Sequence, residues 1–323
     1  MKIAYHLVGM VRTLEFCQFN IKSTIEALSN LPDVNEVVVF CTFWDKTNEY
    51  GYAYVDGKIQ DAKLLPTPLV DVDRVKIQSI LGSFNTDKIK VDINFLDFET
   101  SRYSHSSYLV VIYESYKQRL KYELENGFFS RIVLTRPDVI LYQSKEEISK
   151  ISELLSDIAT LNHHCGMVND TFTPNPYRYD IAKNDRCWFK PKYLNDVPII
   201  DSIAVFHMPI IKDFFFYGNR REMNIIMRGH KYAEMTKSLE RAHTFLASYF
   251  IVMGIGMSNQ MHVGARPLLI KRIFNPQTNQ FEDGFETTFT QETSSIEVIH
   301  TRTEIIYQQE SINAALLPRV NKS

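Results

Sequence analysis

Apolar segments alternate with segments of helical periodicity over the first 145 residues of the chain. Residues 36–43, EVVVFCTF, form a β-branched run without polar alternation, as expected for a strand that is covered on both faces. Residues 12–31 instead repeat apolar side chains every three or four positions, which is typical of an amphipathic helix. Strands and helices that alternate in this way predict a parallel sheet with crossover helices.

The same patterns place further elements along the chain. In the first half we expect strands at 2–8, 36–43, 88–97 and 131–134, the last resuming at 139–141 after a polar segment, and helices at 12–31, 71–83, 107–127 and 145–159. In the second half we expect strands at 199–208, 266–274 and 295–305 and helices at 209–219 and 238–256. Residues 44–68 and 160–200 are rich in Gly, Asn, Asp or Pro and predict long loops, the first with a hairpin at Asp56-Gly57.

Composition narrows the class of protein. With 45% apolar and 23% charged residues the chain can bury a core, and its 323 residues fit one large α/β domain or two domains that share a cleft. The net charge of −2 gives no support for a protein coated by nucleic acid, although it leaves room for a local basic groove. The four cysteines form no CxxC pair, so we expect reduced thiols and no zinc framework.

Two apolar stretches are too short to be targeting or membrane segments. The first, MKIAYHLVGMVR, lacks the length and cleavage site of a signal peptide. The second, TFLASYFIVMGIGM at 244–257, falls short of the roughly 20 residues of a membrane helix. We therefore expect a soluble protein without a membrane span, located in a bacterial or viral-host cytoplasm.

Three strands of the expected sheet end in turns that carry glycine, tryptophan or charged side chains. Open parallel sheets bind ligands at the carboxyl ends of their strands, so these turns would line one crevice although they lie far apart in the sequence. The residues are Gly9 and Arg12 after 2–8, Trp44 and Asp45 after 36–43, and Arg136 and Asp138 within 131–141.

The first of these turns, Gly9-Met10-Val11-Arg12, has two interpretations. A glycine at a strand-to-helix turn lets backbone N–H groups approach a phosphate, and Arg12 can pair with a diphosphate. The alternative is an ordinary turn with a solvent-exposed arginine. The turn matches neither a Walker A sequence nor GxGxxG, which disfavours ATP hydrolysis, dinucleotide redox chemistry and a Rossmann-like methyltransferase.

The segment Thr135-Arg136-Pro137-Asp138 also has two interpretations. Asp138 has the oxygen ligands that Mg²⁺ or Mn²⁺ prefers, and such a cation would bridge two phosphates. Arg136, on the same face of an extended segment, would then grip phosphate or fix the aspartate. The alternative is a structural Arg–Asp pair at the end of a strand.

Two further motifs look like metal sites but have simpler explanations. Asp71-Val72-Asp73 is a D-x-D sequence, yet it precedes RVKIQSIL, and an aspartate there caps a helix. His163, His164 and Cys165 are adjacent, so they cannot easily share one ion, and we interpret them as loop residues.

Three residues of the second half are candidates for catalysis or metal binding. Asp201 lies within an apolar strand, where a carboxylate is costly without a partner, so it is either catalytic or bound to a sugar hydroxyl. Glu240 is either a first-turn carboxylate favoured by the helix dipole or a base that faces the cleft. His300 is either a late metal ligand or a structural histidine.

The order of these motifs resembles a known family. MKIAYHLVGMVRTLEFC, a strand ending in FCTFWD, the 104–141 segment with its RPD, and DSIAVFHMPIIKDFF resemble a loosely defined group of microbial and viral GT-A-type glycosyltransferases. The resemblance covers about 1–145 and 198–256. It implies a GT-A-like, Rossmann-type α/β fold, with a mostly parallel sheet, helices on both faces and a C-terminal extension.

The resemblance also implies roles for parts of the chain. Residues 1–145 would form the nucleotide-sugar-binding half, and 146–323 the acceptor-side half with the C-terminal extension, in one continuous domain. Asp138 would correspond to the last carboxylate of the metal motif, and Asp201 to an acceptor-side or catalytic carboxylate. The residues expected at the nucleotide-sugar donor are Val8, Gly9, Arg12, Trp44, Asp45, Tyr108 and Arg136.

One departure from the family pattern affects the expected chemistry. A GT-A metal motif has two acids, D-x-D, whereas here Arg136 replaces the first. Dependence on Mn²⁺ or Mg²⁺ therefore stays open, and so does a nucleotide-binding or assembly protein without turnover. We expect a glycosyltransferase that acts on a glycan hydroxyl or on a modified DNA base such as hydroxymethylcytosine, with Asp201 or Glu240 as the base.

Overall fold

The computed structural model describes the backbone of 1–47, 69–101, 107–142, 165–167, 215–236, 266–275, 280–288 and 297–301, four short strands at 50–51, 54–55, 58–59 and 65–66, and Tyr249 and Met253. Side chains are described over 1–47, 69–99, 108–141 and 215–235, and at Tyr249 and Met253. In this part of the chain no helix is long and apolar enough to cross a membrane.

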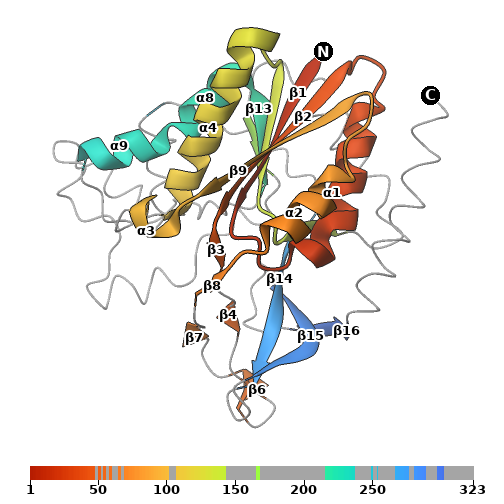
Figure 1. Ribbon diagram of the computed structural model, residues 1–323, viewed down its shortest axis with the longest axis vertical. Helices are drawn as coiled ribbons and strands as arrows, with labels where there is room; N and C mark the ends of the chain where they lie inside the picture. Colours follow the sequence, from red (N-terminus) through yellow and green to blue (C-terminus); the bar gives the residue numbers. More distant parts are fainter. Residues whose placement is uncertain are drawn as a thin grey trace, which may run out of the picture.

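The main sheet has six strands (Figure 1). Their order is β12 (Cys165–Met167), β13 (Phe215–Asn219), β10 (Arg131–Thr135), β1 (Lys2–Gly9), β2 (Glu36–Trp44) and β9 (Ile89–Leu96). β10, β1, β2 and β9 are parallel, and β13 is antiparallel to both of its neighbours. The expected mostly parallel α/β sheet is therefore confirmed.

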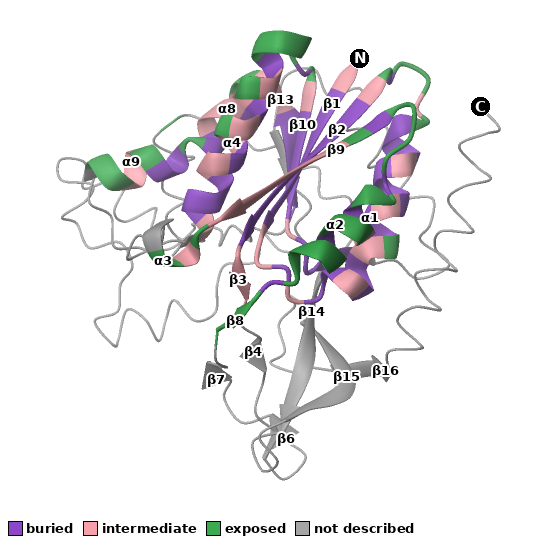
Figure 2. Ribbon diagram, in the orientation of Figure 1, coloured by how far each residue is buried: buried purple, intermediate pink, exposed green. Residues whose placement is uncertain are grey.

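Helices cover both faces of this sheet (Figure 1). One face carries α1 (Leu14–Ser29) and α2 (Arg74–Gly82), and the other carries α4 (Ser107–Asn126), α8 (Arg220–Met227) and α9 (Gly229–Thr236). A single turn, α3 (Phe98–Ser101), precedes α4. Figure 2 shows that α1 and α4 turn their buried sides toward the sheet and their exposed sides away from it.

Strand β2 shows why the sequence has no polar alternation there. Val37 and Val39 belong to the core under α1, whereas Val38 and Phe40 belong to the core under α4. Every residue from Val37 to Trp44 is buried, so both faces of the strand require apolar side chains.

The strand expected at 131–134 and its expected resumption at 139–141 belong to two different sheets. β10 lies in the main sheet, whereas β11 (Val139–Tyr142) pairs with β14 (Arg266–Asn275) in an antiparallel sheet that continues with β15 (Gln280–Thr288) and β16 (Glu297–Thr301). Pro137 has no N–H to donate, and a turn with Val139 N to Arg136 O at 3.4 Å directs the chain out of the main sheet. The expected strand at 266–274 is confirmed, and that at 295–305 is confirmed over 297–301, the rest of it lying outside the described residues.

The expected loop at 44–68 contains an antiparallel arm. Its nested pairs are β3 (Lys46–Thr47) with β8 (Val70–Asp71), β4 (Tyr50–Gly51) with β7 (Leu65–Pro66), and β5 (Tyr54–Val55) with β6 (Lys58–Ile59). The innermost pair flanks Asp56-Gly57, so the expected hairpin is confirmed.

Two helix ends agree with the sequence. The Asp73 carboxylate accepts a hydrogen bond from Lys76 N at 3.0 Å and caps α2, which confirms capping for this D-x-D. Gly127 follows α4 with φ +80°, the left-handed conformation that favours glycine after a helix.

The prediction of a helix at 209–219 is wrong for its last five residues, Phe215–Asn219, which form β13. Phe215 and Tyr217 pack under α1 and Phe216 packs under α4, so the aromatic run is buried on both faces. The next helix, α8, begins only after Asn219, whose side chain accepts from Arg221 N and Glu222 N. The elements expected at 145–159 and 199–208, and that at 238–256 apart from Tyr249 and Met253, lie outside the described residues.

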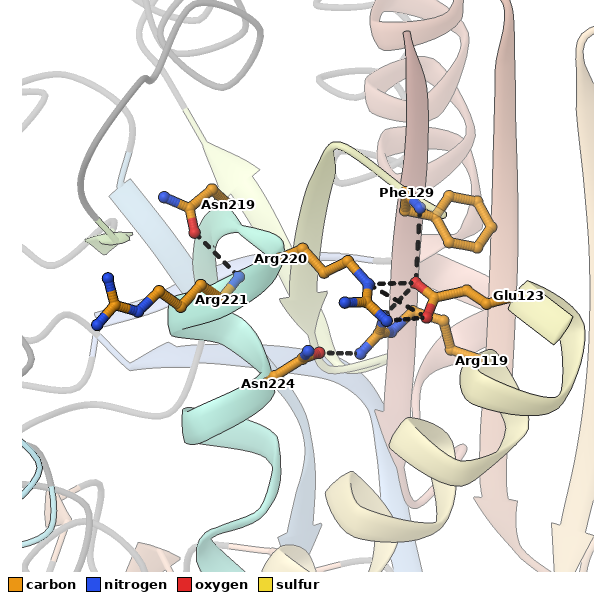
Figure 3. Close-up of polar contacts among 7 residues, drawn as sticks. All are labelled: Arg119, Glu123, Phe129, Asn219, Arg220, Arg221 and Asn224. Atoms are coloured by element: carbon orange, nitrogen blue, oxygen red, sulfur yellow. Dashed lines mark hydrogen bonds and ion pairs between the residues drawn. The ribbon is translucent and has the colours of Figure 1, made fainter. Parts of the chain in front are cut away.

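A buried ion cluster joins α4 to α8 at the edge where β10 begins (Figure 3). Glu123, with 2% of its side chain exposed, accepts from Arg119 and from Arg220, the latter at 2.8 Å. Arg119 also donates to Asn224. Burial alone would raise the pKa of Glu123, but the hydrogen bond from Arg220 and the charge of Arg119 outweigh it and lower the pKa.

Replacing Glu123 tests this cluster. Glu123→Ala leaves two guanidinium groups without their shared carboxylate, so the free energy of unfolding falls by about 3–5 kcal/mol, as for a broken buried pair. Urea unfolding followed by circular dichroism measures it. The matched control is Glu125→Ala, an exposed carboxylate on the same helix, which changes stability by less than about 0.5 kcal/mol. Equal effects at the two positions contradict the assignment.

A buried histidine lies between β1 and α4. His6 Nδ1 is 2.7 Å from Ser115 Oγ, and its ring stacks on Phe40 at 5.2 Å. Burial, and then the charge of Arg119, lower the pKa of His6 well below its ordinary value. The folded protein therefore keeps His6 neutral where an unfolded chain would bind a proton.

This histidine makes stability depend on pH. Above about pH 6.5 His6 is neutral in both the folded and the unfolded protein. Below that pH only the unfolded chain binds a proton at His6. The free energy of unfolding therefore falls by up to about 1.4 kcal/mol for each unit by which the pH is lowered. His6→Asn keeps a polar partner for Ser115 without titrating. Urea unfolding at pH 7, 6 and 5 shows a steeper loss in the wild type than in this variant. Parallel pH profiles contradict the prediction.

Candidate functional site

The three turns singled out in the sequence lie at one edge of the main sheet. Leu7 of β1 pairs with Thr135 of β10, and Gly9 pairs with Phe43 of β2. β1, β10 and β2 therefore end at nearly the same level, on adjacent strands. We call this edge the carboxyl edge.

Gly9 and Pro137 lie close together, in the first and the last of these turns. Gly9 has φ +128°, a conformation in which a side chain is strained. A Cβ at this position would lie 3.7 Å from Pro137 Cδ. The backbone conformation, more than the lack of space, requires glycine here.

Arg12 and Arg136 converge on Asp138, and we call these three side chains the Arg–Asp cluster. Arg136 donates from Nε and Nη2 to the two carboxylate oxygens at 2.8 and 2.7 Å. Arg12 Nη1 lies 3.6 Å from Asp138 Oδ2. The Asp138 side chain is 2% exposed, whereas those of Arg12 and Arg136 are 17% and 18% exposed. A buried carboxylate thus holds two guanidinium groups that reach the surface.

Cys17 lies close to this carboxylate. Burial, and then the charge of Asp138, raise the pKa of the Cys17 thiol far above its ordinary value. Its Sγ is 3.9 Å from Thr13 Oγ1, within reach of a weak hydrogen bond. Cys17 is therefore a neutral thiol that packs beneath the cluster, not a nucleophile. Cys17 and Cys41 are both free and buried, as expected for reduced thiols.

Tyr108 supports Arg136 from the side of α4. The centre of the Arg136 guanidinium is 5.8 Å from the centroid of the Tyr108 ring, within the range of a cation–π contact. Tyr108 is the second residue of α4, so the N-terminus of this helix also lies at the carboxyl edge. Its partial positive charge adds to that of the arginines.

The remaining residues expected at the donor hold the scaffold of this edge. Val8 is fully buried, and Trp44 is 2% exposed and packs edge-on against Phe98 at 5.3 Å. The Asp45 carboxylate accepts from Phe98 N at 2.9 Å and lies 3.6 Å from Arg74 Nη2. The structure therefore places Asp45 among contacts that fix α2 and α3.

Three expected site residues cannot be placed against this cluster. Asp201 and Glu240 lie outside the described residues. His300 belongs to β16, where it pairs with Phe285, and its side chain lies outside the described part of the chain.

The described residues do not fit a divalent cation. Both oxygens of Asp138 accept hydrogen bonds from Arg136, so a cation would have to compete with a guanidinium for a buried carboxylate. Among the side chains that the structure describes, no group of three or more His, Cys, Asp or Glu is arranged to hold a metal ion.

Asn20 is a residue of this region that the sequence did not reveal. Its side chain is buried in α1, donates to Leu141 O at 3.1 Å and accepts from Leu141 N at 2.9 Å. It pairs with β11 as a neighbouring strand would, and it fixes the chain just after Asp138. One feature of the sequence could have revealed it. Asn20 follows Phe16 by four positions, which places a polar residue on the buried side of the helix.

Known proteins resemble this chain only in their solved structures, and only weakly. No protein-family model matches the chain, and no curated protein sequence matches it. Among solved structures, it is similar to the galactosyltransferase LgtC in complex with donor and acceptor sugar analogues (10% identity, TM-score 0.39, covering 80% of this chain and 73% of that one). It is also similar to mouse xyloside xylosyltransferase 1 in its apo form (11% identity, TM-score 0.32, covering 79% and 82%). At these values the likeness carries no function to this chain.

Replacing Asn20 tests how the cluster is held. Asn20→Ala leaves two buried backbone groups of Leu141 without partners, so the free energy of unfolding falls by about 2–4 kcal/mol. Chemical denaturation measures it. Gln18→Ala is the control in the same helix, because the Gln18 side chain donates only to Glu15 O at a partly exposed site. The interpretation fails when Asn20→Ala costs no more than Gln18→Ala.

Proposed function

We propose that the protein is a glycosyltransferase, which transfers a sugar from a nucleotide-diphosphate donor to an acceptor hydroxyl. The observation that carries this proposal is the convergence of Arg12 and Arg136 on Asp138 at the carboxyl edge of a parallel sheet. Ligands of open α/β sheets bind at this edge. The order of the G-x-x-R, Trp-Asp and R-P-D motifs supports the same class.

The chemistry of the proposed reaction requires positive charge at this place. When the bond between the sugar and the diphosphate breaks, negative charge builds up on the departing diphosphate. Guanidinium groups that are already fixed in position stabilise that charge without rearranging during the reaction. Arg12 and Arg136 are fixed by Asp138, and both are partly exposed at the edge.

Roles for the rest of the chain follow from this assignment. Residues 1–145 bind the donor, with the backbone of Val8 and Gly9, and with Tyr108, nearest to the Arg–Asp cluster. Residues 146–323 form the acceptor side, and Asp201 or Glu240 takes the proton of the acceptor hydroxyl. We assign the acceptor to a glycan, because a net charge of −2 gives no general attraction to the phosphates of DNA.

A panel of nucleotide sugars tests the proposal. We expect one donor, among UDP-, GDP-, ADP- and dTDP-sugars, to raise the melting temperature and to release its nucleoside diphosphate on incubation with glycan acceptors. Arg12→Gln weakens binding of that donor by about 10- to 100-fold, because it removes a charged hydrogen-bond donor from the diphosphate.

The matched control is Arg221→Gln. Arg221 is exposed in the first turn of α8, which starts at the opposite edge, since Asn219 pairs with Arg131 at the beginning of β10 (Figure 3). This variant should bind the donor as the wild type does. A panel in which no nucleotide sugar stabilises the protein rejects the proposal, and stabilisation without release of diphosphate points to a binding protein.

A further inference from the structure

Asp138 occupies the position where the family resemblance implies a metal ligand, yet its surroundings suit a different task. Mg²⁺ keeps several waters in a near-octahedral shell, and Mn²⁺ likewise takes oxygen ligands. The Asp138 side chain is 2% exposed, and nitrogen atoms of Arg136 lie 2.7 and 2.8 Å from its two oxygens. A cation and its waters would therefore compete with a guanidinium that is already bound to both carboxylate oxygens.

The geometry of the arginines suits a diphosphate. Arg136 uses the Nε and Nη2 edge of its guanidinium for Asp138, so the Nη1 side is turned away from the carboxylate. Arg12 approaches the same carboxylate through Nη1. The planar fork that matches a carboxylate also matches phosphate, and the three side chains together carry one positive charge.

The orientation of both arginines depends on Asp138. Arg136 packs over Tyr108 on one side, and Asp138 fixes its in-plane rotation through two parallel hydrogen bonds. Arg12 follows the Gly9 turn, where an added Cβ would lie 3.7 Å from Pro137 Cδ, so the segments that carry the two arginines lie close together. One buried carboxylate thus sets the distance between two surface cations.

We infer that Asp138 is a positioning residue that holds Arg12 and Arg136 as a cationic clamp for the donor diphosphate, in place of a divalent cation. This inference rests on the proposed function, because it names how the same site binds its donor. The clamp stabilises the departing diphosphate through fixed guanidinium groups. Binding of the diphosphate is consequently independent of added metal.

The first experiment uses the wild-type chain and UDP, GDP, ADP and dTDP as probes in isothermal titration calorimetry. We expect one of them to bind with a dissociation constant that differs by less than about twofold between EDTA and saturating Mn²⁺ or Mg²⁺. An affinity that rises about tenfold or more with the cation overturns the inference but leaves the proposed function intact. Failure of every probe to bind overturns both.

A double-mutant cycle tests the positioning role with the same probe. Arg12→Gln should weaken binding about tenfold, and Asp138→Asn at least as much, because it releases both arginines. The double variant should weaken binding about as much as Asp138→Asn alone, because Arg12 acts only when Asp138 orients it. The same cycle with Arg221→Gln in place of Arg12→Gln gives additive effects. A purely structural Asp138 gives additive effects in both cycles and overturns the inference, and melting temperatures confirm that each variant is folded.

Discussion

The contact between the Asp138 carboxylate and the guanidinium groups of Arg12 and Arg136 is the constraint on which the site depends. A carboxylate this deeply buried is stable only when it is paired, and pairing it with one residue from each of two turns fixes those turns to each other. Gly9 allows the first turn to approach Pro137, and Asn20 holds the chain beyond the second. The edge of the sheet is thus rigid where a charged ligand would meet it.

The molecule uses the same device twice, at the two ends of β10. At the beginning of the strand, Glu123 is shared by Arg119 and Arg220, and at its end Asp138 is shared by Arg12 and Arg136. The contexts differ. Arg119 is fully buried and donates to Asn224, and Arg220 comes from α8, so the first cluster joins two helices at the beginning of β10. The second cluster joins two turns at the carboxyl edge, where ligands of open α/β sheets bind. Both clusters contain a partly exposed arginine, so the place in the sheet, not the pairing or the exposure, separates a candidate ligand site from a structural support.

Local patterns in the sequence were sufficient for much of the fold. The unbroken apolar run of β2 predicted a strand covered on both faces, and Asp73 and Gly127 marked helix ends because their chemistry acts within one turn. The approach of Arg12 to Asp138 was also predictable, since the ends of parallel strands share one edge. The aromatic run at β13 was predicted wrongly, because a short apolar run fits a strand or a helix equally well.

Contacts between distant parts of the chain gave no such signal. The pair of Glu123 and Arg220 spans 97 residues, and that of Asn20 and Leu141 spans 121. The side chains of Glu123, Arg220 and Asn20 would each be ordinary on the surface of their own helix, and only the packing of the helices on the sheets makes the pairs. The same holds for Trp44 and Val8, whose positions at strand ends suggested ligand contact until burial placed both side chains in the core.

The division of 131–142 between two sheets has a mechanical consequence. Only residues 136–138 connect the last residue of β10 to the first of β11, and two of those three residues belong to the Arg–Asp cluster. The antiparallel sheet of β11, β14, β15 and β16 is therefore joined to β10 through this linkage. A shift of that sheet against the parallel one would be transmitted to the segment that carries Arg136 and Asp138, and so to the spacing of the two guanidinium groups.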